Sequence, residues 1–210
     1  QMIKTLGFTY VCEVTFGVDL VAREYKKLFD DFKGKYFITS MCPVVVSMVE
    51  KYHPEMVNNL APIISPIIAT AQAVHNQYGS NVRIVHIGPC IQSKEEAKLY
   101  NGKSQIDEVL TFVELRQLFE EFNINESNLE YSEFDEPIGY KGSLYPIGRG
   151  ILQAVDISED LLTGTVISAN GPNNTLQALE QFETSAEMIN RHFNLFYCEG
   201  CLMGPGTSKG

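Results

Sequence analysis

Short runs of β-branched and aromatic residues alternate along this chain with longer segments in which apolar residues recur at helical spacing. The strand candidates are residues 9–16, 35–39, 82–87, 164–169 and 193–197, with a weaker candidate at 129–134. Alternation of strands with amphipathic helices predicts an α/β fold with a mostly parallel sheet.

Three of the intervening helices carry clear start and stop signals. Residues 65–79 open with Ser-Pro, which suits an N-cap and first helical position, and end at a glycine. Residues 111–122 begin with a Thr and Glu three positions apart, the pattern of a capping box. Residues 43–52 start with proline and stop before another proline. These signals support the α/β prediction.

Composition limits the classes of function. The 210 residues carry 16 Lys and Arg against 26 Asp and Glu, a net charge of −10, which argues against nucleic-acid and anionic-membrane surfaces. A 44% hydrophobic content excludes a disordered chain, and no apolar run approaches the ~20 residues of a membrane span. The sequence shows no export signal, repeat or long linker. We therefore predict a cytoplasmic protein of one domain or two tightly joined lobes.

Four of the five cysteines each follow a predicted strand and precede a helix start or a glycine-rich turn: Cys42, Cys90, Cys198 and Cys201. In open α/β sheets, ligands gather beyond the carboxyl ends of the strands. Backbone N–H groups at helix starts and tight turns also stabilise thiolates. The sequence therefore predicts that these thiols converge on one point.

Other interpretations of the cysteines remain open. Cys12, in the middle of a predicted strand, is expected to be a small core residue. The Cys-Glu-Gly-Cys pair ending at Cys201 also fits thiol-redox or zinc chemistry. The Leu-Met-Gly-Pro-Gly that follows opposes the helix a thiol-redox pair needs, and four-thiolate zinc sites usually come as two local pairs. Ligands this scattered favour an iron–sulfur cluster between lobes.

Three segments resemble the catalytic domain of iron-only (FeFe) hydrogenases. Thr-Ser-Met-Cys-Pro at residues 39–43 is similar to that family's Thr-Ser-Cys-Cys-Pro motif, and the similarity continues into the following helix. Gly-Pro-Cys at 88–90, followed by Lys94 and Glu96, resembles the second motif, Met-Pro-Cys with lysines and a glutamate. The cysteine pair and glycines at 198–206 resemble the third. The resemblance covers essentially the whole chain.

The resemblance implies a fold and a cofactor. The fold would be α/β, with two lobes of mostly parallel sheet flanked by helices and a metal cluster in the cleft between them. The family holds an H-cluster, whose 4Fe-4S cubane has four cysteine ligands; in catalytic members one cysteine also bridges to a diiron subsite. Carried over residue by residue, the ligands would be Cys42, Cys90, Cys198 and Cys201. Residues 1–210 would then be a fragment of an H-cluster domain whose flanking domains lie outside it.

Departures from the family pattern concern proton transfer. The relay cysteine of the family falls at Met41, whose thioether cannot exchange a proton. The relay serine aligns with Ala61, and the relay glutamate falls near Glu24 or Tyr25. This chain would therefore lack the groups that carry protons to a diiron site.

Further departures concern the diiron subsite itself. The lysine that contacts a diiron cyanide ligand aligns with Ser93, while Lys94 lies one residue later. The last motif is Cys-x-x-Cys rather than Cys-x-x-x-Cys, which leaves the bridging thiolate without an assigned position. The diiron subsite is accordingly doubtful.

The remaining polar candidates are weaker. The four histidines are expected to be structural or solvent-facing, and His86, four residues before Cys90, is the most interesting of them. Arg149, in a glycine-containing stretch, is a possible donor near the cluster.

The leading hypothesis is a hydrogenase-like domain that binds a 4Fe-4S cluster for redox sensing or electron relay, without efficient hydrogen turnover. Its partners would be a ferredoxin-type electron-transfer domain or protein and a sensory domain in the full-length chain. The rivals are an active FeFe hydrogenase with an unconventional proton path, an iron–sulfur cluster assembly factor, and a structural zinc module.

Overall fold

The computed structural model describes residues 1–31, 34–100, 102, 105–157 and 164–208. Its helices are α1 (Met2–Thr5), α2 (Thr15–Asp30), α3 (Pro43–Tyr52), α4 (Pro66–Tyr78), α5 (Ser93–Ala97), α6 (Phe112–Glu121), α7 (Gly150–Ala154) and α8 (Pro172–Ile189). Its strands are β1 (Val85–Gly88), β2 (Glu108–Thr111), β3 (Val166–Asn170) and β4 (His192–Phe196). Across these residues, every helix falls short of the length and hydrophobicity needed to cross a bilayer.

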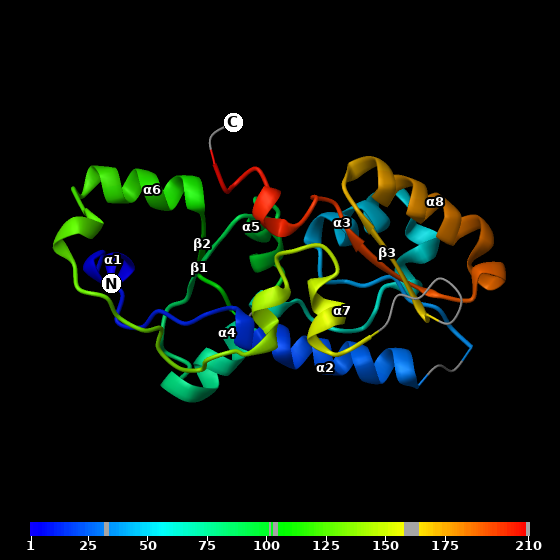
Figure 1. Cartoon of the computed structure of the whole chain (residues 1–210), viewed down its shortest axis with the longest axis horizontal. Coiled ribbons are helices and arrows are strands. Elements are labelled where there is room, and N and C mark those ends of the chain that lie inside the picture. Colours follow the sequence, from blue (N-terminus) through cyan, green and yellow to red (C-terminus); the bar gives the residue numbers. More distant parts are fainter. Residues whose placement is uncertain (32–33, 101, 103–104, 158–163, 209–210) are drawn as a thin grey trace.

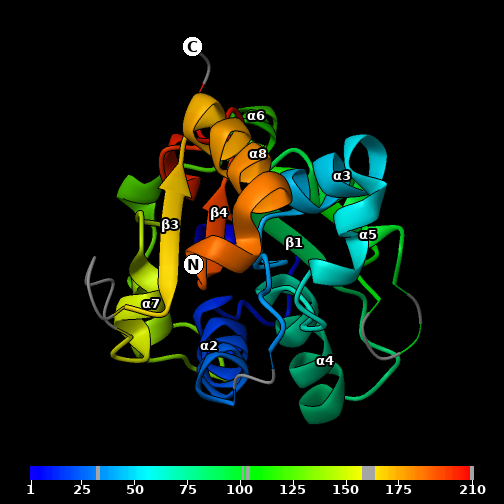
Figure 2. The same ribbon diagram turned by 90° about the vertical axis from the view of Figure 1, so that its right-hand side faces the viewer.

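The strands form two separate parallel pairs, one in each half of the molecule. β1 pairs with β2, and β3 pairs with β4. Figure 1 shows β1 and β2 with α6 on the left, and β3 with α3 and α8 on the right. Figure 2 shows β3 and β4 side by side with α8, and α2 and α4 below them. The predicted α/β class, with short parallel sheets flanked by helices, is confirmed.

Several predicted strands have a different structure. Residues 35–39 run beside β4 but pair only through Ile38, which bridges to Phe193 and to Leu60. Residues 9–16 form one isolated bridge, between Cys12 and Asp135, and already enter α2. Apolar residues recur at helical spacing from this point, so the helix overrides the β-branched run. The weak candidate at 129–134 is not a strand.

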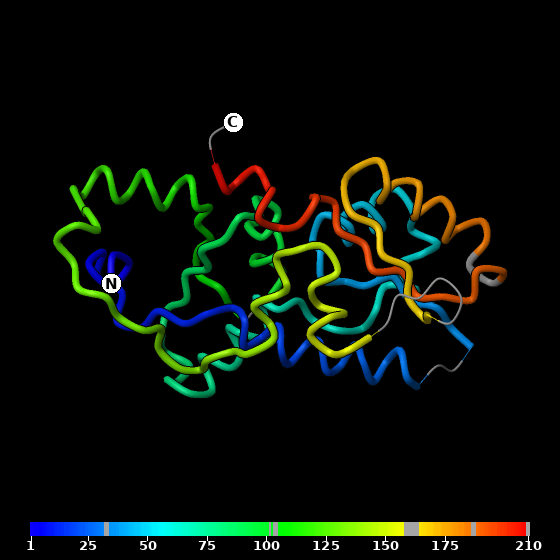
Figure 3. The backbone as a smooth tube through the Cα atoms, in the orientation of Figure 1, coloured from blue at the N-terminus to red at the C-terminus, as the bar shows by residue number. Residues whose placement is uncertain are grey.

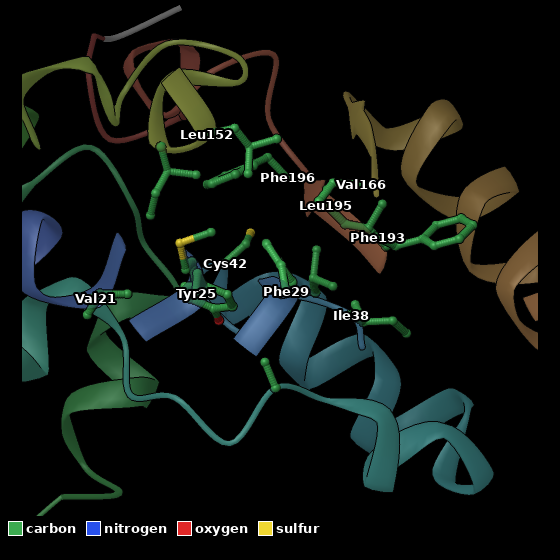
Figure 4. Packing of buried hydrophobic residues seen from close by; sticks show 14 of the residues in the cluster. Val21, Tyr25, Phe29, Ile38, Cys42, Leu152, Val166, Phe193, Leu195 and Phe196 are labelled. Carbon is green, nitrogen blue, oxygen red and sulfur yellow. The ribbon is translucent and has the colours of Figure 1, made fainter. Parts of the chain in front are cut away.

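Two hydrophobic cores correspond to the two halves. The larger gathers residues of α2, α3, α7, α8 and β4, and Figure 4 shows Tyr25, Phe29 and Phe193 within it. The smaller is built mainly from α4 and β2, around Ile68 and Val109. Each half therefore has its own packed interior, which suits two tightly joined lobes.

Helices α2 and α4 cross closely and tie the halves together. At Gly17 a methyl group would overlap the Pro66 carbonyl oxygen and the Thr70 side chain, so only glycine permits this approach. Figure 3 shows further connections, because the N-terminal stretch, the segment before α7 and the C-terminal stretch each run between the halves.

Candidate metal centre

Three chain segments deliver thiols to one place between the halves. Cys42 is the N-cap of α3, Cys90 follows β1, and Cys198 and Cys201 follow β4. All four cysteines line a single cavity of about 1170 Å³, which has walls from both halves. The structure thus brings together the four residues that the sequence singled out, and their role as ligands stays a prediction.

Mutual repulsion shows how close the thiols lie. Burial, together with the charges of Cys42, Cys90 and Cys198, raises the pKa of Cys201 to about 12. Burial likewise raises the pKa of Cys42 to about 11, with a contribution from Cys90. Such thiols stay protonated at neutral pH unless a cation replaces their protons, which is what a metal site does.

The spacing of the sulfurs separates a cluster from a single ion. In the described part of the chain, no three cysteine sulfurs lie within 4.8 Å of one another. A tetrahedral zinc ion with Zn–S bonds of about 2.3 Å places its sulfurs only about 3.8 Å apart. A cubane carries its thiolates on four separate irons and so spreads them further apart. The donor set and its spacing therefore fit a 4Fe-4S cluster better than a structural zinc ion.

The glycine-rich turn after Cys201 is fastened to the turn that carries Cys90. Gly206 N–H donates to the Pro89 carbonyl at 3.0 Å, and the Gly206 carbonyl accepts from Val113 N–H at 3.0 Å. A Cβ at Gly206 would lie 2.6 Å from the Pro89 oxygen, so a side chain would push the two turns apart. Glycine at this position lets the second and third motifs approach each other.

Of the two residues near the expected position of the relay glutamate, Tyr25 and not Glu24 faces the first motif. Glu24 faces solvent and pairs with Lys27 at 2.6 Å, whereas Tyr25 is 1% exposed and reaches Ser40, next to Met41. Ser40 N–H donates to the Tyr25 hydroxyl at 2.8 Å, and that hydroxyl lies 2.9 Å from Ser40 Oγ. Figure 4 shows Tyr25 and Cys42 in the same core.

This hydrogen-bond chain ends at backbone carbonyls. Ser40 Oγ donates to the carbonyl of Ala61 at 2.9 Å or of Ile63 at 2.7 Å, so Tyr25 in turn donates to Ser40 Oγ. Burial raises the pKa of Tyr25 to about 12. A carbonyl cannot take up a proton at neutral pH, so the chain fixes the first motif in place and does not conduct protons.

Met41 and Ala61 occupy the two other positions that the resemblance assigns to the proton relay. Both side chains are buried, at 1% and 4% exposed, and neither can exchange a proton. The Met41 carbonyl accepts a hydrogen bond from the Tyr145 hydroxyl at 3.2 Å. The positions that the resemblance assigns to a proton relay are therefore held by groups that pack and anchor.

Ser93 and Lys94 point in different directions. Ser93 is 3% exposed and lines the cavity. Lys94 turns to the outer side, where its ammonium binds the Glu114 carboxylate at 2.5 Å. That contact, with further hydrogen bonds from Thr111, lowers the pKa of Glu114 to about 2. Lys94 thus joins α5 to α6 and does not take the place of a cavity lysine.

Two polar cavity residues have roles that sequence reasoning missed. The Tyr145 hydroxyl contacts the Cys201 thiol as well as Met41, but Tyr145 lies in an irregular segment where no pattern marks it. Glu96 lines the cavity, and burial raises its pKa to about 7, although the Ser65 hydroxyl favours the charged form. The second motif contained Glu96, but only the fold shows that its carboxyl faces inward.

The histidines divide as follows. His75 donates to the Val82 carbonyl at 3.1 Å and His192 accepts from Phe37 N–H at 3.1 Å, so both are structural. His53 lies at the surface beside Glu55 and Glu183. His86 lines the thiol cavity.

His86 occupies space that a side chain at position 88 would need. A Cβ at Gly88 would lie 2.7 Å from His86 Nε2. Burial lowers the pKa of His86 to about 4, so the imidazole is neutral. Cys12 also lines the cavity and donates to the Glu136 carbonyl at 3.1 Å; it is only half-buried and pairs through one isolated bridge, not in a strand core as expected. Arg149 is exposed and does not line the cavity.

Comparison with known proteins decides the family. The family described as "Iron only hydrogenase large subunit, C-terminal domain" matches residues 1–205. The chain belongs to this family. It is therefore a hydrogenase-like domain of the H-cluster type.

Individual relatives agree with this assignment. The domain is 28% identical over 222 residues to "Iron hydrogenase 1" of Clostridium pasteurianum, covering 92% of this chain and 39% of the relative. It is 27% identical over 190 residues to "NADP-reducing hydrogenase subunit HndD" of Solidesulfovibrio fructosivorans, covering 79% of this chain and 32% of the relative. The chain thus spans well under half the length of either relative.

Solved structures share the fold. The apo [FeFe]-hydrogenase HydA1 of Chlamydomonas reinhardtii aligns with a TM-score of 0.72 at 21% identity, covering 100% of this chain and 72% of that chain. A structure concerned with oxygen inactivation and degradation of the H cluster 2Fe subcluster aligns with a TM-score of 0.71 at 20% identity, covering 99% of this chain and 72% of that chain. At this identity the likeness concerns the fold alone.

Proposed function

We propose that this hydrogenase-like domain binds a 4Fe-4S cluster through Cys42, Cys90, Cys198 and Cys201 and uses it for redox sensing or electron relay, without efficient hydrogen turnover. When bound, the cluster supplies one-electron storage. The protein supplies four thiols from three segments and a mostly apolar cavity around them. The electron donor would be a ferredoxin-type domain or protein.

The proposal rests on the residues at the positions of the family's proton relay, which cannot pass protons on. Hydrogen turnover needs a continuous supply of protons through groups that both give and accept them. Here Met41 and Ala61 are buried and cannot exchange protons, and the Tyr25 hydroxyl is committed to Ser40. The thiol set survives while the path for protons does not, which favours electron storage over turnover.

A second candidate, an active FeFe hydrogenase with a different proton path, rests on the size of the cavity. Ser93, His86 and Cys12 line the cavity as well as the four thiols, and its volume of about 1170 Å³ provides room beyond a cubane. The named hydrogenases among the relatives also support this candidate.

Metal content and spectroscopy distinguish the two candidates. The protein is reconstituted anaerobically, its iron and acid-labile sulfide are counted, and infrared spectra are recorded in the CO and CN stretching region. Four irons without diatomic bands support the sensor or relay. Six irons with such bands, together with hydrogen evolution at rates typical of hydrogenases, would overturn it in favour of the second candidate.

Cysteine variants test the ligand set. Replacing Cys42, Cys90, Cys198 or Cys201 by Ser should each remove most of the visible cluster absorbance. Cys12→Ser is the matched control, because Cys12 lines a different part of the same cavity and should leave the spectrum unchanged. An unchanged spectrum in Cys90→Ser would exclude that ligand and weaken the argument from convergence.

A further inference from the structure

A carboxyl group lines the thiol cavity. Glu96 lies in α5, and its side chain lines the cavity together with the four cysteines. Its charge is felt by Tyr145, whose hydroxyl contacts both Cys201 and the Met41 carbonyl. Glu96 is thus the acidic group of α5 that faces the cavity, and both Glu96 and the cysteines act on Tyr145.

A buried hydroxyl points to the same place. Ser65 is 3% exposed and also lines the cavity. Among the described residues, no group lies within normal hydrogen-bond geometry of its Oγ. This hydroxyl faces the Glu96 carboxyl and favours its ionised form. A buried hydroxyl beside a carboxyl allows that carboxyl to change its charge at a modest cost.

The cations of the same helix are engaged elsewhere. Lys94 is held by Glu114 at 2.5 Å, and Lys98 by Glu95 at 2.7 Å on the exposed side. Arg83 also lines the cavity, but its side chain is 80% exposed and lies 3.7 Å from the Asp107 carboxylate. Tyr100 and Tyr145 feel the charge of Glu96, and His86 and the four cysteines share its cavity; none of these groups is a cation at neutral pH.

We propose that Glu96 takes up the proton that accompanies one-electron reduction of the cluster, so that this domain couples its redox state to pH; this inference rests on the proposed function. The cluster gains one electron from a ferredoxin-type donor, which is oxidised by one electron. The Glu96 carboxylate gains one proton from solvent and becomes a carboxylic acid. The net charge of the cavity is unchanged, and reoxidation releases the proton.

The state of the carboxyl before reduction fits this role. Burial raises the pKa of Glu96 to about 7, so in a large fraction of the molecules this carboxyl is ionised at and above neutral pH. An added electron in a cavity of low polarity favours the protonated form further. His86 also lines the cavity, but burial lowers its pKa to about 4, so it would take up a proton only at a greater cost.

The test is a potentiometric titration of the reconstituted protein, followed by EPR, between pH 6 and 9. Above about pH 7 the midpoint potential should fall by about 59 mV per pH unit, the value for one proton per electron. In Glu96→Gln the potential should become independent of pH. Glu95→Gln is the matched control: its carboxylate is exposed and paired with Lys98, and its slope should equal that of the wild type.

Each other outcome has a definite meaning. Wild-type protein that assembles no 4Fe-4S cluster would contradict the proposed function itself. A cluster whose potential ignores pH, or a slope that persists in Glu96→Gln, would overturn the inference and leave the proposed function standing. A slope lost in His86→Asn but kept in Glu96→Gln would also overturn it.

Ser65→Ala keeps the inference testable if Glu96→Gln does not load. Removing a hydroxyl that favours the ionised carboxyl should move the onset of the slope to higher pH. An unchanged onset would overturn the assignment to Glu96. Unfolding of the apo chain gives a further readout: ionised Glu96 is penalised by burial, so wild type should lose stability relative to Glu96→Gln as pH rises from about 4.5 through 7.

Discussion

Tyr25→Phe tests whether the first motif is anchored as described. The substitution removes one oxygen atom from a side chain that is 1% exposed. Ser40 N–H then loses the acceptor it meets at 2.8 Å, while Ser40 Oγ keeps the carbonyls of Ala61 and Ile63. The substitution therefore removes two hydrogen bonds and leaves the Ser40 N–H as an unsatisfied, half-buried donor.

The expected magnitude follows from that count. An unsatisfied buried donor costs about 1–3 kcal/mol. Because Ser40 is half-buried, we expect the free energy of unfolding to fall by about 2 kcal/mol. With an m value of ~3 kcal/mol/M, the urea midpoint should fall by ~0.7 M.

Urea unfolding followed by circular dichroism measures this change. The matched control is Tyr140→Phe, whose side chain belongs to a residue that is 83% exposed and whose midpoint should not move. A midpoint shift in Tyr25→Phe as small as that of the control would refute the anchoring role. Hydrogen evolution supplies a second check: a fall in residual turnover would show that the Tyr25 hydroxyl carries protons, contrary to its pKa of about 12.

Three further predictions concern the relay, the helix crossing and one ion pair. Met41→Cys with Ala61→Ser, supplied with a diiron precursor, should raise residual hydrogen evolution, because each restored acid–base group contributes ~10²–10⁴-fold; if the diiron unit binds and turnover stays unchanged, the relay is not the obstacle. Gly17→Ala should lower the free energy of unfolding by ~1–3 kcal/mol, since its methyl group overlaps the Pro66 carbonyl, and a thermal melt equal to wild type would contradict this crossing. Glu114→Gln should destabilise the protein at pH 7 and progressively less as pH falls from about 4.5 to 2. The reason is that a carboxyl with a lowered pKa stabilises the fold only while it is ionised. A difference in urea midpoints that does not depend on pH would exclude the ion pair with Lys94 as the source of the destabilisation.

The sequence predicted the helices whose starts are marked by capping residues or proline. The capping box at Thr111 and Glu114 marks the start of α6, and Ser-Pro marks the start of α4, as predicted. The parallel pairing of short strands followed from alternation with helices. Such local signals work because the backbone groups they satisfy belong to neighbouring residues.

Other features depended on contacts between distant residues. β2 has only four residues and was not recognised, because its pairing with β1 and not its own pattern makes it a strand. Whether Glu24 or Tyr25 faces inward was open until α2 was placed against the first motif. The inward direction of Glu96 and the outward direction of Lys94 likewise follow from how α5 packs between the cavity and Glu114.

Hydrogen turnover and electron storage place different demands on the supply of protons to the cavity. Turnover consumes protons continuously, so it fails when even one step of a relay is closed, and here Met41, Ala61 and the Tyr25–Ser40 chain close several. Storing a single electron needs only one compensating proton, which the cavity-lining Glu96 can hold without passing it on. A domain that lost its relay while keeping an inward carboxyl would therefore lose catalysis and retain a redox state that responds to pH. This is the combination expected of a sensor, and the dependence of the midpoint potential on Glu96 separates it from an electron relay whose potential is fixed.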